Sequence, residues 1–180
     1  MKRAVFLDRD GVLNQSIVRD GKPYPPKNVS EVVILPGVEE ALELLRDQNF
    51  DFVVVTNQPD VARGTSTTKV VSEINEHISN LLNLDSFYTC YHDDLDDCEC
   101  RKPKPGLLTK AAIDFNIDLN TSYMVGDRWR DIAAGQAAGC ENFFIDYSYE
   151  EARPTMPYIA VTSLLGAAQH IQEIEKHGKN

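Results

Sequence analysis

Two aspartates, Asp8 and Asp10, directly follow the apolar run 4–7 near the start of the chain. A continuous apolar run predicts a strand that is buried on both faces of a parallel sheet. Gly11 then lets the chain turn, so both carboxylates are expected at the carboxyl end of a central strand, where open α/β sheets bind ligands. Two acids this close repel each other unless a cation lies between them. The pattern is compatible with a Mg²⁺ site that includes a nucleophile, or with a polar turn after a strand.

The composition describes a folded domain with an acidic surface. The chain has 180 residues, 42% hydrophobic and 26% charged, which is enough for one domain over residues 1–180 with a sizeable core. The formal net charge of -10 argues against a general nucleic-acid or anionic-membrane binder. No signal peptide or membrane-spanning apolar run is visible, so we expect a soluble cytoplasmic protein. Binding of an anionic substrate would require positive charge gathered locally.

Strands are predicted to alternate with helices, which indicates a doubly wound, Rossmann-like α/β domain with helices on both faces of a parallel sheet. Residues 14–36, rich in proline, are expected to form a loop. No G-x-G-x-x-G follows the first strand, so a dinucleotide-binding version has no support. After the first strand, the predicted strands are 52–55, 87–91, 122–125, 142–145 and 159–161, and the predicted helices are 37–47, 67–84, 105–116, 129–138 and 163–176.

Chemically capable side chains are expected at further strand ends of this sheet. Thr56 follows the second strand, and Asp127 and Asp131 follow a later one. Because the carboxyl ends of parallel strands meet at one edge, these groups should lie near Asp8. A hard cation held by Asp8, Asp127, a backbone carbonyl and waters in octahedral geometry describes Mg²⁺. The basic cluster 101–104 and the Thr56 hydroxyl would neutralise and orient phosphate oxygens.

In this order, the motifs resemble those of the haloacid-dehalogenase superfamily of aspartate-nucleophile phosphatases. The resemblance covers residues 6–146, nearly the whole chain. Each motif is short, but four of them in order at the expected strand ends form a specific signal. The motifs are Asp8-Arg9-Asp10-Gly11-Val12, Thr56-Asn57-Gln58, Lys102 and Gly126-Asp127-x-x-x-Asp131.

The resemblance implies a two-step phosphatase mechanism. Asp8 would attack phosphorus and form an aspartyl-phosphate. Asp10 would protonate the leaving oxygen and then take a proton from the water that cleaves the intermediate. Thr56 and Lys102 would stabilise the phosphoryl oxygens. Lys104 is also within reach by sequence, and Lys102 is preferred because the family places its lysine directly after a Cys-Arg pair.

The same resemblance implies a Mg²⁺ site at Asp8, Asp10 and Asp127. The cation would bridge the nucleophile and the phosphate and cancel the repulsion between the two anions. For Asp131 two interpretations remain: it supports the waters of the metal, or it is an acid favoured at the start of a helix by the helix dipole.

A cluster of cysteines and one histidine predicts a second metal site. Cys90, His92, Cys98 and Cys100 supply three thiolates and an imidazole, a standard set for structural tetrahedral Zn²⁺. The alternative is a group of free cysteines in an acidic loop. Zinc would brace a loop that lacks apolar content and would fix the basic residues that follow it. The acids among residues 93–97 are expected to form a solvated face.

The zinc loop narrows the resemblance to a branch without a cap domain, which includes heptose-bisphosphate and histidinol-phosphate phosphatases. The segment 56–64, which reads Thr-Asn-Gln-Pro-Asp-Val-Ala-Arg-Gly, resembles the heptose members. The resemblance therefore implies a monomeric enzyme that acts on a phosphosugar. The alternatives are a histidinol-phosphate phosphatase, a broader phosphatase of small phosphosugars, and a catalytically inactive zinc-braced interaction module.

The resemblance also implies which residues contact the substrate. Three arginines beside strand ends would bind the second phosphate of a bisphosphate, although each taken alone could equally be a solvent-exposed charge. The predicted substrate-binding residues are Ser16, Ile17, Val18, Arg19, Asn57, Gln58, Arg63, Arg101 and Arg128.

Overall fold

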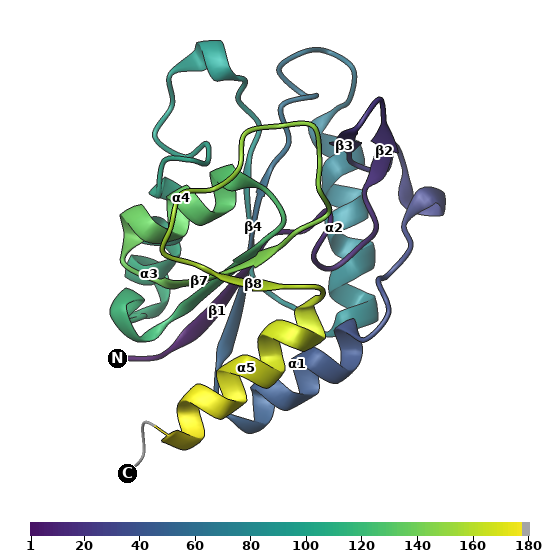
Figure 1. Ribbon diagram of the computed structural model, residues 1–180. Coiled ribbons are helices and arrows are strands. Elements are labelled where there is room, and N and C mark those ends of the chain that lie inside the picture. Colours follow the sequence, from purple (N-terminus) through teal and green to yellow (C-terminus); the bar gives the residue numbers. More distant parts are fainter. Residues whose placement is uncertain (178–180) are drawn as a thin grey trace.

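The structure, a computed structural model, describes residues 1–177 and is built on a six-stranded parallel sheet (Figure 1). The strand that carries the first aspartates lies in the interior of the sheet and pairs with a neighbour on each side. This is the position that its continuous apolar sequence predicts. In spatial order the strands are β5 (Phe87–Cys90), β4 (Asp51–Asn57), β1 (Ala4–Leu7), β6 (Tyr123–Gly126), β7 (Glu141–Ile145) and β8 (Ile159–Val161).

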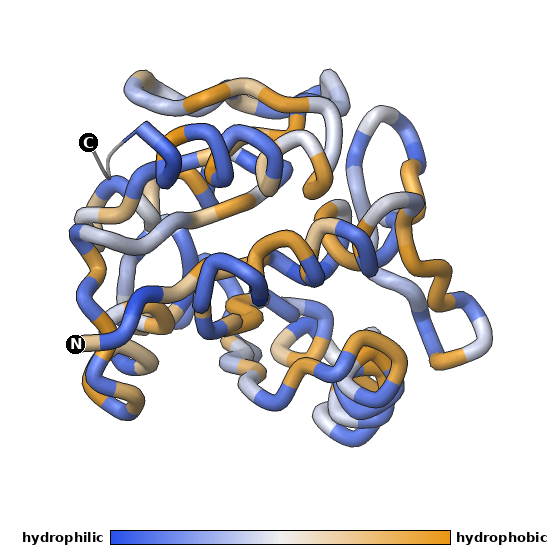
Figure 2. Tube along the Cα trace, turned by 90° about the horizontal axis from the view of Figure 1, so that it is seen from below, coloured by the Kyte–Doolittle hydropathy of each residue, from blue (hydrophilic) through white to orange (hydrophobic). Residues whose placement is uncertain are grey.

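Helices cover both faces of the sheet and bury two apolar clusters. In β1, Val5 and Leu7 belong to one cluster, whereas Ala4 and Phe6 belong to the other, because successive strand residues point to opposite faces. The helices alternate hydrophobic and hydrophilic residues along the tube (Figure 2), as amphipathic helices do. The first cluster lies under α1 (Val38–Asp47), α2 (Thr68–Leu82) and α5 (Leu164–His177), and the second under α3 (Gly106–Phe115) and α4 (Trp129–Ala138).

The predicted doubly wound fold is therefore confirmed, but one predicted loop is wrong. Within residues 14–36 the chain forms an antiparallel hairpin of β2 (Ile17–Arg19) and β3 (Lys22–Tyr24). Its two turn residues, Asp20 and Gly21, both have positive φ, 49° and 70°. An Asp-Gly pair favours this turn, and Pro23 is tolerated because the hairpin is a separate two-stranded sheet.

The remaining connections are short. They contain the 3₁₀ turns η1 (Val29–Glu31), η2 (Asp94–Asp96) and η3 (Leu119–Thr121). Over residues 1–177, the connections from β1 to α1 and from β4 to α3 hold no folded module beyond the hairpin, these turns, α2 and β5. In the same described range, the helices are too short or too polar to cross a membrane.

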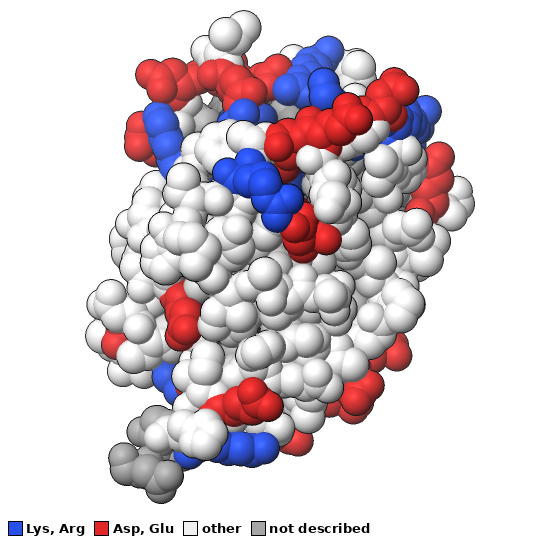
Figure 3. All heavy atoms as spheres, in the orientation of Figure 1, with Lys and Arg blue, Asp and Glu red and all other residues white. Residues whose placement is uncertain are grey.

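The loops after β1, β4 and β5 rise from the same end of the sheet, at the top of Figure 1. On the face shown in Figure 3, acidic and basic side chains gather along this upper edge, while the middle of the face carries few charges. The topology thus brings charged residues from distant parts of the sequence to the carboxyl ends of the strands, where open α/β folds bind ligands.

Candidate active site

Three buried carboxylates meet where β1 and β6 end. Asp8 follows β1, Asp127 follows β6, and Asp131 lies in the first turn of α4, with carboxylate oxygens within 4.8 Å of one another. Two glycines make this approach possible. A Cβ on Gly11, whose φ is +87°, would lie 1.9 Å from Asp127 Oδ2, and a Cβ on Gly126 would lie 2.1 Å from Asp131 Cβ. Any larger residue at either position would push the carboxylates apart.

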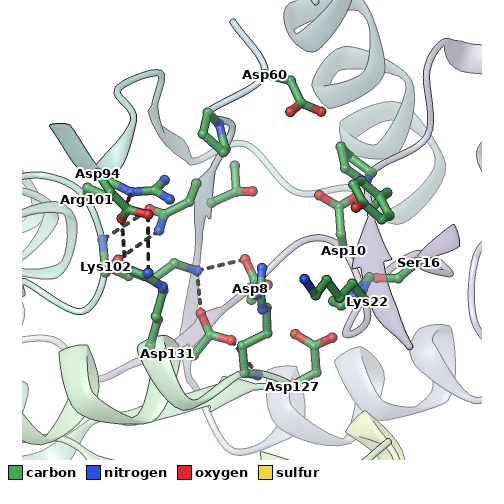
Figure 4. Close-up of a pocket in the computed structure, with 18 of the residues that line it drawn as sticks. Asp8, Asp10, Ser16, Lys22, Asp60, Asp94, Arg101, Lys102, Asp127 and Asp131 are labelled. Carbon is green, nitrogen blue, oxygen red and sulfur yellow. Dashed lines mark hydrogen bonds and ion pairs between the residues drawn. The ribbon is translucent and has the colours of Figure 1, made fainter. Parts of the chain in front are cut away.

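Lys102 is the cation at the centre of this group. Its side chain is only 2% exposed, and its Nζ lies 2.8 Å from Asp8 Oδ1 and 2.7 Å from Asp131 Oδ1 (Figure 4). Burial alone would lower the pKa of Lys102, but the charges of Asp131 and Asp8 outweigh that effect and raise it. The ammonium therefore stays charged. Lys104, the alternative by sequence, pairs with two exposed acids of the cysteine loop.

Asn57 fixes the backbone from which Lys102 extends. Its Nδ2 donates to the Lys102 carbonyl oxygen at 2.9 Å, and its Oδ1 accepts from the Lys102 amide at 3.1 Å. The end of β4 is thereby tied to the cysteine loop by two hydrogen bonds. The Lys102 Nζ also donates to the Val55 carbonyl oxygen at 2.7 Å, so the lysine is held at both ends of its side chain.

The buried carboxylates fit a divalent cation. Burial, followed by the charge of Asp131, raises the pKa of Asp8 to about 7. Burial and the charge of Asp8 likewise raise the pKa of Asp127, and its Oδ1 is buried with no hydrogen-bond partner among the described residues. A carboxylate oxygen buried without a donor is costly. A hard cation with oxygen ligands would satisfy this oxygen and remove the repulsion.

Asp131 has both carboxylate oxygens occupied by hydrogen-bond donors. Oδ1 accepts from Lys102, and Oδ2 accepts from the Arg128 backbone amide at 2.9 Å at the start of α4. These contacts hold Lys102 toward Asp8 and favour a supporting role for Asp131 over direct contact with a metal.

Asp10 is turned toward a set of hydrogen-bond donors beside the cavity. Arg9, fully buried, contacts both of its carboxylate oxygens at 3.2 and 3.0 Å, and Asn14 donates to it at 2.9 Å. The Gln58 Nε2 donates to Asp10 and to the Thr56 hydroxyl, at 2.9 Å in each case. Gln58 therefore links the end of β4 to the loop after β1.

The cysteine loop brings its four predicted ligands together. The Sγ atoms of Cys90, Cys98 and Cys100 lie 3.2 to 3.7 Å from one another, and His92 Nδ1 lies 3.6 Å from Cys90 and 3.3 Å from Cys100. Zinc bound tetrahedrally at about 2.3 Å from each sulfur would place the sulfurs about 3.8 Å apart. Burial raises the pKa of the Cys90 thiol, so a thiolate there requires a cation. The group could hold zinc.

Acids of this loop lie at the surface, as expected, and several of them also pair with basic residues. Arg63 Nε donates to Asp93 at 2.7 Å, and Arg101 Nε donates to Asp94 at 2.9 Å. Arg130 Nη1 also lies 3.0 Å from Asp94. The two acids thus hold three arginines at the rim of the cavity. Asp94 is the first residue of η2, and Asp93 is its N-cap.

The cavity lies between the cysteine loop and the hairpin and has a volume of about 360 Å³. Of the predicted substrate-binding residues, Ser16, Asn57, Arg63, Arg101 and Arg128 line it, and Gln58 supports it. The structure does not place Ile17, Val18 and Arg19 in its lining. The hairpin turns β3 rather than β2 toward the cavity, and Arg19 lies over the Tyr24 ring instead.

Lys22 and Tyr149 are among the residues of this site that the sequence did not reveal. Lys22 of β3 extends into the space between Asp10 and Asp127 (Figure 4). The Asp-Gly turn before it could have revealed the hairpin. Tyr149 comes from the segment after β7, and its hydroxyl donates to Asp127 Oδ2 at 2.9 Å. No local signal in the sequence marks it.

The family follows from comparison with known proteins. The model of the haloacid dehalogenase-like hydrolases matches residues 26–139. The chain therefore belongs to the haloacid dehalogenase-like hydrolases, the superfamily that its motifs resemble.

The names of individual relatives state a substrate as well as a family. The chain is 38% identical over 153 residues to D-glycero-beta-D-manno-heptose-1,7-bisphosphate 7-phosphatase of Pasteurella multocida (strain Pm70), an alignment covering 79% of this chain and 80% of that protein. It is 29% identical over 183 residues to the corresponding alpha-anomer enzyme of Photorhabdus laumondii, with 94% and 97% covered. The crystal structure of D,D-heptose 1.7-bisphosphate phosphatase from B. bronchiseptica, complexed with magnesium and phosphate, superposes with a TM-score of 0.83 at 29% identity and covers 97% of this chain and 99% of that one.

The charge balance around Lys102 predicts the stability of two lysine variants. In Mg²⁺-free buffer, Lys102→Met should lower the free energy of unfolding by about 3–5 kcal/mol, because it leaves buried carboxylates without their cation. Lys104→Met, which removes a half-exposed lysine at the surface, should have a much smaller effect. Urea unfolding of both variants measures the difference. Equal losses would contradict the central role of Lys102.

Proposed function

We propose that the chain is a Mg²⁺-dependent phosphatase that removes the 7-phosphate of D-glycero-D-manno-heptose 1,7-bisphosphate. The observation that carries the proposal is the buried group of Asp8, Asp127 and Asp131 around Lys102, at the end of the sheet and open to a cavity. The names of the relatives support the substrate. We propose that it acts as a cytoplasmic monomer in nucleotide-heptose synthesis for lipopolysaccharide or another surface polysaccharide.

The proposed reaction uses Asp8 as nucleophile. A carboxylate oxygen of Asp8 forms a bond to phosphorus as the bond to the sugar oxygen breaks, and the leaving oxygen takes a proton from Asp10. Water then attacks phosphorus in the aspartyl-phosphate, and Asp10 takes a proton from that water. The bond between phosphorus and the Asp8 oxygen breaks, which releases inorganic phosphate and restores the Asp8 carboxylate. Lys102 and the Thr56 hydroxyl donate to the phosphoryl oxygens as charge shifts among them.

Asp8, Asp10 and Asp127 are proposed to hold Mg²⁺. When bound, the cation supplies charge neutralisation between the nucleophile and the phosphate. The pKa of Asp8, raised to about 7 by burial and its neighbouring acid, supports this assignment, because a nearby dication would favour the ionised nucleophile. The magnesium and phosphate in the B. bronchiseptica crystal structure are consistent with it.

The second phosphate of the substrate needs a basic partner, and Lys22 is the strongest candidate. Among the basic residues that line the described cavity, it alone forms no ion pair with a described acid. Arg63, Arg101 and Arg128 are already paired with carboxylates, so a phosphate near them would have to compete or share. We therefore propose that Lys22 makes the main contact with the second phosphate and that these arginines add further contacts to it.

Zinc at Cys90, His92, Cys98 and Cys100 is proposed to be structural. The ligand set has no open position for chemistry. Its proposed effect on the reaction is indirect, through the following residues 101–102 and through the loop acids that hold the rim arginines.

Replacing the nucleophile should abolish turnover without weakening the fold. Wild-type protein should release p-nitrophenol from p-nitrophenyl phosphate only with Mg²⁺, and Asp8→Asn should show no release. Its unfolding temperature should not fall, because the change removes one of several repelling buried charges. Asp51→Asn, at the start of β4 and therefore at the end of the sheet away from the site, serves as the matched control and should keep the wild-type rate.

Residual turnover in Asp8→Asn would remove Asp8 as the nucleophile. A wild-type protein with no Mg²⁺-dependent release would instead favour the inactive interaction module.

The substrate is tested by measuring kcat/KM with Mg²⁺ for both anomers of heptose 1,7-bisphosphate and for histidinol phosphate. A preference of about a hundredfold for one heptose anomer, worth nearly 3 kcal/mol of transition-state binding, is expected. Lys22→Met should lower kcat/KM for that bisphosphate by roughly 10–100-fold, since it removes a charge-assisted contact. The loss on p-nitrophenyl phosphate, which carries a single phosphate, should be much smaller.

Lys27→Met, in the same segment but outside the cavity lining, is the control for Lys22. A uniform loss on all substrates in Lys22→Met would contradict its role at the second phosphate. A preference for histidinol phosphate would leave the mechanism standing but would contradict the assigned sugar.

Elemental analysis should find about one zinc per chain. Cys98→Ser should lose zinc and most of its activity, because the rim arginines would lose their anchors. Cys140→Ser, which changes a buried cysteine outside the loop, should keep both. Active wild-type protein without zinc would contradict the site.

A further inference from the structure

A segment after β7 reaches back over the ends of β1 and β6. Its two tyrosines, Tyr147 and Tyr149, stack with ring centroids 5.5 Å apart and an interplanar angle of 29°. The Tyr147 hydroxyl donates to the Gly11 carbonyl oxygen at 3.0 Å, and the Tyr149 hydroxyl donates to Asp127 Oδ2 at 2.9 Å. One tyrosine therefore contacts the loop after Asp10, and the other contacts the carboxylate at the end of β6.

The segment is also tied down on either side of the cavity. The Glu150 amide donates to the Gly21 carbonyl oxygen at 2.9 Å, which joins it to the hairpin turn. The Arg128 Nε donates to Glu151 Oε2 at 2.9 Å, which joins it to the start of α4. With both ends attached, the tyrosine rings have a defined position relative to Asp127.

We infer that Tyr149 is a positioning residue for the divalent cation: its hydroxyl holds Oδ2 of Asp127 and leaves Oδ1 as the ligand atom. The inference rests on the proposed Mg²⁺ site. Oδ1 is buried without a hydrogen-bond partner among the described residues, whereas Oδ2 has its donor. With Oδ2 held by a donor and Oδ1 without one, binding of the cation through Oδ1 alone is favoured over binding through both oxygens.

The surroundings of Asp127 keep this arrangement fixed. The backbone of Gly11 packs so close to Oδ2 that an added Cβ would lie at 1.9 Å. A tyrosine hydroxyl carries its proton at neutral pH, so Tyr149 acts as a donor to Oδ2. The carboxylate is thus confined by backbone on one side and by a permanent donor on the other.

If Asp127 is already held in position before the cation binds, less conformational entropy is lost on binding. Removing a group that hydrogen-bonds to a metal ligand typically lowers metal affinity or activity by roughly 10–100-fold. Without the Tyr149 hydroxyl, Asp127 could rotate or offer both oxygens, and the geometry at the cation would be less defined. Loss of the hydroxyl should therefore weaken cation binding more than it slows the reaction of enzyme that holds the cation.

The test compares Mn²⁺ binding to zinc-containing wild type, Tyr149→Phe and Tyr147→Phe. Electron paramagnetic resonance measures the concentration of free Mn²⁺ in each titration. Tyr149→Phe should raise the Kd for Mn²⁺ by roughly 10–100-fold. The Mg²⁺ concentration for half-maximal hydrolysis of p-nitrophenyl phosphate should rise similarly, while kcat at saturating Mg²⁺ changes far less. Tyr147→Phe keeps the stacked ring and removes its hydroxyl, which contacts Gly11 and not Asp127. This variant should leave the Kd for Mn²⁺ near the wild-type value.

Each other outcome has a definite meaning. A wild-type Kd in Tyr149→Phe would overturn the inference and leave the proposed function intact. Equal weakening in both variants would also overturn it, because the segment as a whole would then be responsible. Absence of Mn²⁺ and Mg²⁺ binding to wild-type protein would overturn the proposed cation site itself, and the inference with it. Unfolding temperatures of both variants, measured without added cation, identify any general loss of folding.

Discussion

The site depends on one electrostatic constraint, the burial of three carboxylates around a single ammonium group. Asp8, Asp127 and Asp131 lie within 4.8 Å of one another, and Lys102 reaches two of them. With all groups ionised, three negative charges and one positive charge leave a net charge of -2. Burying such an excess of negative charge is unfavourable, and a divalent cation would neutralise it. The same unfavourable charge contributes to the raised pKa values of Asp8 and Asp127.

Several local features follow from this constraint. Glycine is required at positions 11 and 126, because the carboxylates occupy the volume where a Cβ would be. Asn57 holds the backbone of Lys102 with two hydrogen bonds, so the lysine cannot withdraw from the acids. The parallel sheet supplies the rest, since it brings strand ends that are far apart in sequence to one edge. The same sheet core would tolerate many apolar substitutions, whereas the residues around the acids have little freedom.

The sequence predicted the features that depend on local pattern. The order of the strands and helices follows from apolar runs, periodic faces and turn residues, and the structure reproduces it. The motif residues Asp8, Thr56, Lys102 and Asp127 were expected together because parallel strand ends converge, and the structure brings them together. Their roles in the reaction remain predictions.

Features that depend on long-range contacts were not accessible from the sequence. Lys102 is buried beside Asp8 whereas Lys104 lies at the surface, a difference that two lysines in the same loop of the sequence do not reveal. The carboxylates that pair with the rim arginines come from other segments, so a single arginine carries no sign of its partner. Tyr149 reaches Asp127 only because the segment after β7 folds back over the sheet. The hairpin is a different case, because the Asp20-Gly21 pair marked it and the surrounding prolines obscured it.

The paired arginines bear on how an acidic protein can bind an anionic substrate. A chain with a net charge of -10 repels anions at long range. At the cavity, Asp93 and Asp94 hold arginines in place but also neutralise them, so the rim offers directed donors rather than a broad positive field. Under the proposed function, a phosphate gains most where it reaches an unpaired cation such as Lys22, in addition to the buried Lys102. Two cationic positions on opposite sides of one cavity would distinguish a molecule with two phosphates from one with a single phosphate, and would do so by spacing rather than by overall charge.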